Sequence, residues 1–198
     1  MRIRIMRTSL TFACLLLGLG GPGCGSDTTS GHPPDGSSQT SGTLDPTAFG
    51  QKYKFADNEM SGWTQDPTIP FWTGKGTDLE SRIDGGNMAY LSRGCLVAMY
   101  QDLVEGDQAA CEIVAMDLGT EANAVSMVAY EQQLRSASIA IPGYDASAAI
   151  GAAIQGGLTA YAHFGSLYFE VQMQGYADQS TGASVAAQFL QKLQSKSK

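Results

Sequence analysis

The sequence has few of the residues that commonly hold a metal ion or carry out catalysis. Its 198 residues include 2 His and 4 Cys, and no His lies near either of the cysteines of the later chain. After the N-terminal segment it contains no G-x-S-x-G, H-E-x-x-H, C-x-x-C or phosphate-binding loop. We therefore expect no metal site and no cofactor, and we assign no catalytic residue.

Positive charge is also scarce. Lys and Arg number 12 against 19 Asp and Glu, which gives a net charge of −7. Removal of residues 1–23 would take away three Arg and no acidic residue, leaving a mature chain near −10. This charge opposes binding to nucleic-acid phosphates, so we expect no nucleic-acid partner.

No apolar run is long enough to cross a membrane. The longest, Leu10–Gly20, has about 11 residues, whereas a helix needs about 20 to span a hydrocarbon layer of about 30 Å. Arg2, Arg4 and Arg7 precede it. A positive segment followed by a short apolar one is typical of a cleaved export signal, which we assign to residues 1–23.

Cys24 follows this signal directly, after the small residue Gly23. The junction resembles the lipobox of bacterial lipoproteins, although Gly21 stands where Leu is usual. The resemblance implies that the Cys24 sulfur receives a diacylglycerol and that its amine carries an acyl chain such as palmitate, anchoring the protein to a membrane of the cell envelope. The outer membrane is favoured, with the leaflet left open. The alternative is an ordinary signal peptide with Cys24 incidental.

Composition divides the rest of the chain into two parts. Residues 24–46 are mostly Gly, Ser, Thr and Pro, which bury too little apolar surface to offset chain entropy, so we predict a disordered tether. Residues 47–198 have the length and apolar content of a single globular domain.

Cys95 and Cys111 are the cysteines of this domain. In an oxidising compartment they would form a disulfide across a loop of about 15 residues, worth about 3 kcal/mol in the chain-entropy model. Two separate buried thiols are the alternative. We favour the bridge.

Aromatic residues are concentrated between Phe49 and Trp72. Pro67 and Pro70 interrupt the segment, so we expect a short strand and an irregular loop. Trp63, Phe71 and Trp72 are candidates to line a ligand pocket, but we favour a segment that packs onto the sheet.

The segment Thr77–Arg93 has the pattern of a helix. Thr77 and Glu80 form a possible capping box, and Gly94 would end the helix. The pair Gly85 and Gly86 disfavours a helix by about 1 kcal/mol per residue, so close packing or ligand contact should offset it. Asp84, Gly85 and Gly86 are therefore further ligand-binding candidates.

Patterns in the remaining chain predict two hairpins and two helices. The elements expected are strands at Cys95–Tyr100 and Ala109–Met116, a helix at Thr120–Leu134, strands at Leu158–Phe164 and Leu167–Met173, and a helix at Thr181–Lys196. The sequence SIAIPG at 138–143 is predicted to form a short strand that ends at Pro142, and residues 143–157 receive no assignment. The order predicts an α+β domain with a single antiparallel sheet of four to six strands and helices packed on one face. It is also compatible with a Mog1/PsbP-like α/β/α sandwich.

The segments Ile83–Leu91 (IDGGNMAYL) and Asp117–Ala124 (DLGTEANA) carry a family resemblance. They resemble motifs of exported bacterial lipoproteins catalogued only as a domain of unknown function. Met88 stands where that family tends to have Glu. The resemblance implies an exported domain and no known activity.

Three hypotheses for function remain. We favour a membrane-anchored, non-enzymatic binding or structural domain whose protein or small-molecule partner is unknown. A carrier of a small apolar ligand would need a cavity under Phe71 and Trp72. A hydrolase-type enzyme would use Asp84, His163 and Glu170 as acid and base groups, and we expect these three not to converge.

Overall fold

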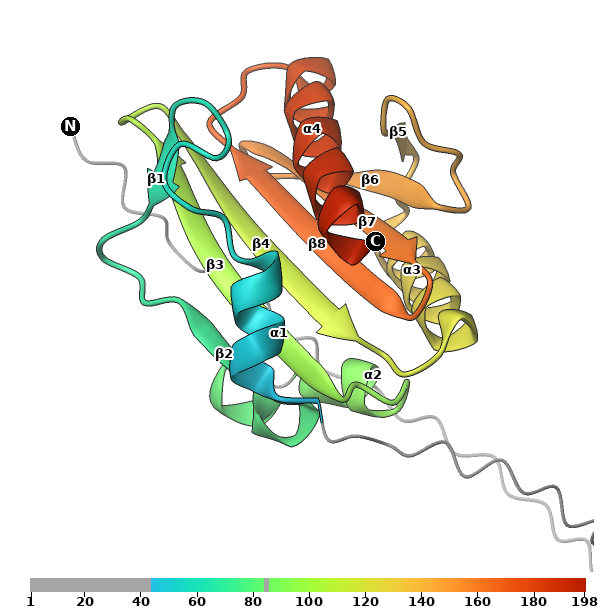
Figure 1. Ribbon diagram of the computed structural model, residues 1–198. Helices are drawn as coiled ribbons and strands as arrows, with labels where there is room; N and C mark the ends of the chain where they lie inside the picture. Colours follow the sequence, from blue (N-terminus) through green and yellow to red (C-terminus); the bar gives the residue numbers. More distant parts are fainter. Residues whose placement is uncertain (1–43, 84–85) are drawn as a thin grey trace, which may run out of the picture. The chain divides into compact units, whose positions relative to one another are not determined.

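The computed structural model describes residues 44–83 and 86–198, which fold around an antiparallel sheet of eight strands (Figure 1). Seven strands lie in the order β1-β3-β4-β8-β7-β6-β5, and β2 also pairs with β3. The strands are β1 (Trp63–Gln65), β2 (Trp72–Lys75), β3 (Val97–Glu105), β4 (Ala109–Asp117), β5 (Ile139–Ala140), β6 (Ala149–Ile154), β7 (Gly157–Phe164) and β8 (Leu167–Gln174).

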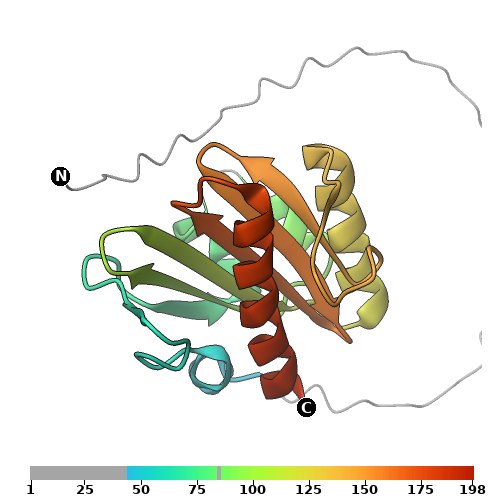
Figure 2. The same ribbon diagram turned by 90° about the horizontal axis from the view of Figure 1, so that it is seen from above.

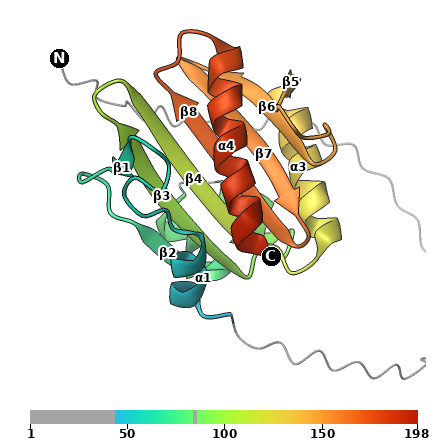
Figure 3. The same cartoon turned by 45° about the horizontal axis from the view of Figure 1, so that its top comes forward.

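Helices cover both faces of this sheet (Figures 1 and 3). One face carries α1 (Pro46–Tyr53) and α4 (Gln179–Ser197); the other carries the 3-10 turn η1 (Gly76–Ser81), α2 (Asn87–Leu91) and α3 (Glu121–Arg135). The prediction of four to six strands with helices on one face was therefore wrong. The run Val97–Tyr100 is buried at every position, which requires cover on both sides of its strand.

Two hairpins form the centre of the sheet, as their turn residues predict. β3 pairs with β4 from Val97↔Asp117 to Glu105↔Ala109, and Gly106 takes a positive φ of 56° in the turn. β7 pairs with β8 around Gly165, with a φ of 59°. β4 and β8 then join the two hairpins, with Val114 opposite Glu170.

The α4 side of the sheet holds an aromatic core. Phe189 of α4 packs edge-on against Phe55 and Trp63, each with ring centroids 5.3 Å apart. Gln101 of β3 lies in this interior and is fully buried. Its amide donates to the Phe55 carbonyl and accepts from the Phe55 N–H, both at 2.8 Å. The aromatic N-terminal segment is thus fixed to the sheet by hydrogen bonds as well as by ring contacts.

The α3 side holds a second core. The Thr120 side chain accepts from the Asn123 N–H, so Thr120 is the N-cap, as predicted. Met127 and Val128 of α3 pack on the sheet, whereas Val125 is 42% exposed. Figure 2 shows α3 and α4 separated by the sheet.

The predicted single helix Thr77–Arg93 is instead two short elements, η1 and α2. Asp78, and not Glu80, makes the reciprocal cap, because its carboxylate accepts from the Lys75 N–H at 2.8 Å. Gly94 follows α2 with a φ of 74°, which agrees with its expected role at the helix end.

Helix α1 was not predicted. Asp45 caps it by accepting from the Thr47 N–H at 3.0 Å, and Pro46 occupies its first turn. The helix therefore begins within the last residues assigned to the tether. In the described ranges, no helix combines the length and apolar character that a membrane span requires.

Candidate functional site

A row of four side chains, three of them polar, crosses the α3 side of the sheet. Tyr100 of β3 lies opposite Val114 of β4, which lies opposite Glu170 of β8, which lies opposite Tyr161 of β7. Cross-strand partners project from the same face of a sheet, so these four side chains form one continuous line. The alternation in β8 predicts this position for Glu170, with Leu167, Phe169, Val171 and Met173 on the opposite face.

Glu170 is held by two tyrosine hydroxyl groups. Tyr90 of α2 donates to Glu170 Oε1 at 2.8 Å, and Tyr168 donates to the same oxygen at 2.9 Å. Tyr168 is fully buried, and the rings of Tyr90 and Tyr168 lie 6.3 Å apart. We refer to Tyr90, Tyr100, Tyr161, Tyr168 and Glu170 together as the Glu170 site.

The surroundings of Glu170 oppose its negative charge. Burial is the largest cause and the Glu131 carboxylate the next, and together they raise the pKa of Glu170 to about 7. The hydrogen bonds from Tyr90 and Tyr168 act in the other direction but do not cancel these effects. Glu170 can therefore gain or lose a proton near neutral pH.

Two polar atoms of the site make no hydrogen bond within the described chain and are not sealed in the interior. They are Glu170 Oε2 and the Tyr100 hydroxyl oxygen. The Tyr161 hydroxyl has a partner, because it lies in hydrogen-bond contact with the Thr159 side chain. Tyr100 is otherwise buried, with 6% of the residue exposed. Buried polar side chains are normally paired, so these two atoms suit contact with a ligand.

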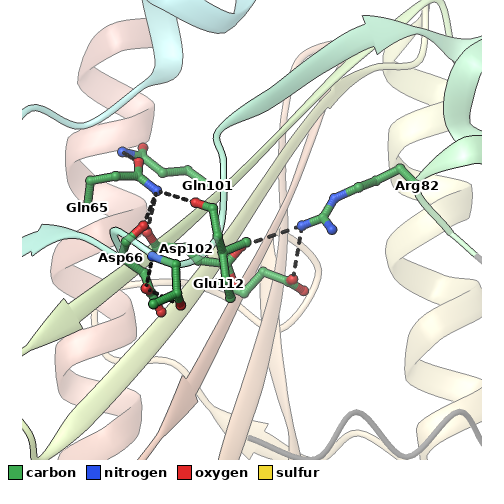
Figure 4. A network of polar contacts seen from close by, with 8 residues as sticks. Gln65, Asp66, Arg82, Gln101, Asp102 and Glu112 are labelled. Carbon is green, nitrogen blue, oxygen red and sulfur yellow. Dashed lines mark hydrogen bonds and ion pairs between the residues drawn. The ribbon is translucent and has the colours of Figure 1, made fainter.

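A charged cluster lies beside this site. Arg82 approaches Asp102 Oδ2 at 3.4 Å and Glu112 Oε2 at 3.7 Å, and its guanidinium lies 4.9 Å from the Tyr100 ring centroid (Figure 4). Asp102 and Glu112 face each other across β3 and β4. Arg82 follows η1, so these pairs fix the short turn to the sheet.

Figure 4 also shows the contacts that hold the chain near β1. Gln65 Nε2 donates to the Asp102 carbonyl at 3.0 Å, and Gln101 Nε2 donates to Gln65 Oε1 at 3.0 Å. These amides satisfy one another and nearby backbone groups. We therefore assign this part of the network to structure.

Helix α3 contributes a second acidic side chain to the neighbourhood of Glu170. Glu131 is 4% exposed and pairs with Arg135, whose Nε lies 3.3 Å from Glu131 Oε2. Burial, the largest cause, raises the pKa of Glu131, while Arg135 and Arg93 oppose the rise. Arg93 itself lies 4.4 Å from the Tyr130 ring centroid.

The aromatic candidates do not form a common pocket. Trp63 packs on Phe189 in the core on the α4 side, and Phe71 contacts the same core. Trp72 packs against Tyr100 on the opposite face, with centroids 5.6 Å apart. Successive strand residues point to opposite faces, which separates Phe71 from Trp72.

Of the glycine candidates, Asp84 and Gly85 lie outside the described residues. Gly86 is exposed at the N-terminal end of α2. It borders a surface hollow between α2 and α3 that Met88, Arg93 and Tyr130 also line. The structure does not bring Gly86 together with Trp63 or Phe71.

The expected disulfide is not formed, and that prediction was wrong. Cys95 and Cys111 are both free and buried, in the α3-side and α4-side cores respectively. Cys111 lies opposite Leu103, eight residues along the chain from Cys95, so the thiols are on the order of 25 Å apart. A disulfide needs Cα atoms within about 7 Å. Burial raises the pKa of Cys95 to about 12, which leaves it an unreactive thiol.

His163 shares a sheet face with Glu170 but does not contact it. Its Nε2 lies 3.1 Å from the Ser147 carbonyl oxygen, and its Nδ1 is buried without a hydrogen-bond partner. Tyr168, not Glu170, lies opposite His163 across the strands. His163 and Glu170 therefore do not form an acid–base pair in this structure.

Sequence reasoning identified Glu170 but missed its tyrosines. Tyr161 and Tyr168 belong to predicted strands, and their parity relative to Glu170 would have placed them on its face. Tyr90 lies in the predicted helix segment, and no local pattern indicates which strand it contacts. Only the folded arrangement places it on β8.

No known protein family has a model that matches the sequence, and no curated protein matches it. Among solved structures, the chain is similar to the extracellular domain of PknH from Mycobacterium tuberculosis. The identity is 12% and the TM-score 0.40, over 67% of this chain and 81% of that chain. A similarity of this size establishes neither a shared fold nor a shared activity.

Proposed function

We propose that this protein is an exported lipoprotein, anchored through acylated Cys24 to the cell envelope, with a non-enzymatic binding domain that takes a small ligand at the Glu170 site. The anchor and the tether come from the sequence, and Cys24 lies outside the described residues. The resemblance to uncharacterised exported lipoproteins supports the same location.

One observation supports a binding role most directly. At the Glu170 site, one carboxylate oxygen of Glu170 and the hydroxyl of the buried Tyr100 ring make no hydrogen bond within the described chain. In a protein interior such groups usually find partners, and leaving them open costs free energy. A ligand that pairs with them recovers that cost.

The enzyme alternative receives less support. It needs His163 within hydrogen-bond reach of Glu170, and the Nε2 of His163 is directed to Ser147 instead. Glu170 accepts from two tyrosines, an arrangement that orients a carboxylate without supplying a nucleophile. The carrier alternative needs Phe71 and Trp72 over one cavity, but these rings pack on opposite faces.

The experiment is mass spectrometry of the full protein extracted from its native membrane. We expect an acylated Cys24 and a co-purifying small molecule that is lost in Glu170→Gln. The matched control is Glu80→Gln, which removes an exposed carboxylate of η1. An unmodified Cys24 would refute the anchor, and a ligand content equal in both variants would refute the site.

A further inference from the structure

The surface hollow between α2 and α3 is separate from the Glu170 site. It has a volume of about 440 Å³ and is lined by Gly86, Met88, Ala89, Ser92, Arg93 and Tyr130. Sites for small molecules usually have volumes of about 300–1,000 Å³. The five residues of the Glu170 site are not among these lining residues, so a ligand in the hollow goes beyond the function proposed above.

Arg93 supplies the charge of this hollow and is held firmly in place. Its Nη1 donates to the Ala89 carbonyl at 2.8 Å, and its Nε donates to Ser126 Oγ of α3 at 3.3 Å. Its Cζ lies 4.4 Å from the centroid of the Tyr130 ring. The guanidinium is therefore fixed between the two helices before a ligand arrives, which reduces the entropy that binding costs.

These contacts leave part of the Arg93 guanidinium unused. Within the described chain Nη2, which carries two N–H donors, makes no hydrogen bond and is not sealed in the interior. Arg93 also makes no ion pair with a described carboxylate. Glu131 is near enough for the charge of Arg93 to act on it, but its paired cation is Arg135. Linking α2 to α3 accounts for Nε and Nη1 but not for Nη2.

The other walls of the hollow suit an apolar group. Met88 leaves 66% of its surface exposed, and Ala89 and Tyr130 are partly buried against the core on the α3 side. A flexible thioether and an aromatic ring both pack well against apolar parts of a ligand. Arg93 is the one charged residue among the described lining residues, so the hollow attracts an anion and repels a cation.

We propose that this hollow binds the carboxylate of a small organic acid. Arg93 Nη2 donates to the carboxylate, and the apolar part of the acid lies against Met88 and Tyr130. Hydrogen bonds between a guanidinium and a carboxylate are charge-assisted and about twice as strong as neutral ones. An amine of the same length is repelled by Arg93, and an alcohol lacks the charge, so the site discriminates among the three.

The test is an NMR titration of the full mature protein, labelled with nitrogen-15, with hexanoate as the probe at pH 7. Hexylammonium and hexanol serve as comparison ligands of similar length. We expect hexanoate to shift the Arg93 Nε–H signal and the amide signals of residues 88–93 to saturation. It should bind at least about tenfold more tightly than either comparison ligand.

Variants separate the two parts of the site. Arg93→Gln removes the charge and should weaken hexanoate binding by about tenfold or more. Met88→Gln keeps the length of an exposed side chain but makes it polar, so it should weaken hexanoate about threefold and leave acetate unchanged. The matched control is Lys52→Gln, which removes an exposed cation of α1 on the opposite face of the sheet and should change the Kd by less than twofold.

Three results would overturn the inference: no saturable shift with hexanoate, equal or tighter binding of hexylammonium or hexanol, or unchanged binding in Arg93→Gln. The comparison of the three probes uses the unaltered protein and does not depend on any variant folding. Glu170→Gln should bind hexanoate as tightly as the unaltered protein, and a loss there would contradict a separate site. If hexanoate does not bind but a co-purifying molecule is lost in Glu170→Gln, the proposed function stands and only this inference fails.

Discussion

Glu170 lies where the interior of the domain meets solvent, with one oxygen held by tyrosines and the other open. Burial and the neighbouring Glu131 raise its pKa to about 7, whereas an unfolded chain would restore the ordinary value near 4.5. Folding therefore favours the protonated acid. This contribution to stability is complete below about pH 4.5 and is lost as pH rises through about 7.

The first prediction concerns the pH dependence of stability. Between about pH 5 and about pH 8, the unaltered protein should lose up to about 3 kcal/mol relative to Glu170→Gln, because the variant has no charge to bury. Urea unfolding of both proteins at the two pH values measures this difference, in which other titrating groups cancel. A difference that is the same at both pH values would show that Glu170 titrates normally.

The second prediction concerns the buried amide of Gln101. Gln101→Leu leaves both the N–H and the carbonyl of Phe55 without partners in the core, and it should destabilise the fold by about 2–4 kcal/mol. Gln133→Leu, on the exposed side of α3, should change stability by less than about 0.5 kcal/mol. Chemical denaturation compares the two. Similar small effects would mean that the Gln101 network does not hold the N-terminal segment.

At the scale of elements, the join between β6 and β7 imposes a strict limit on side-chain size. A Cβ atom at Gly157 would lie 1.8 Å from the Met173 carbonyl oxygen of β8, whereas one at Gly156 would meet nothing within 4 Å. The two neighbouring glycines therefore serve different purposes. Gly156 supplies a φ of 77°, and Gly157 allows two strands to approach.

The third prediction uses this pair. Gly157→Ala should cost about 3 kcal/mol or more because the backbone of β8 has to move. Gly156→Ala should cost only about 1–2 kcal/mol, the strain of a positive φ. Thermal unfolding of the two variants gives the comparison, and equal losses would contradict the tight approach of β7 to β8.

The elements that local pattern determines are the ones that sequence predicts well. Gly106 and Gly165 indicate the two hairpin turns, and Thr120 indicates the start of α3, because turn and cap chemistry act within a few residues. The prediction of a single helix over residues 77–93 was wrong. The Asp78 carboxylate accepts from the Lys75 N–H, in place of the capping box expected between Thr77 and Glu80. β6 was missed because the segment containing it has no clear period, and pairing with β7 decides its structure.

At the scale of the whole domain, the candidate site depends on contacts that no local pattern contains. The Tyr90 hydroxyl donates to Glu170, which is 80 residues later in the sequence. This contact between α2 and β8 depends on the order of the strands in the sheet, β3-β4-β8. The position of Glu170 on its strand could be predicted from alternation, but the identity of its partners could not. The number of strands was underestimated because β6 lies in a segment without a clear period and because the aromatic segment supplies two short strands, β1 and β2, where one was expected.

The fourth prediction tests the placement of the two domain cysteines in separate cores. In the folded protein, iodoacetamide should label neither Cys95 nor Cys111, because both are buried and their raised pKa values disfavour the thiolate. After unfolding without a reductant, mass spectrometry should find both thiols alkylated. A bridged, unlabelled pair under those conditions would contradict the sheet register.

The most direct test of the account is the titration of the Glu170 side chain followed by carbon-13 NMR in the mature protein. The account predicts a carboxyl pKa of about 7. A pKa near the ordinary value of 4.5 would contradict it.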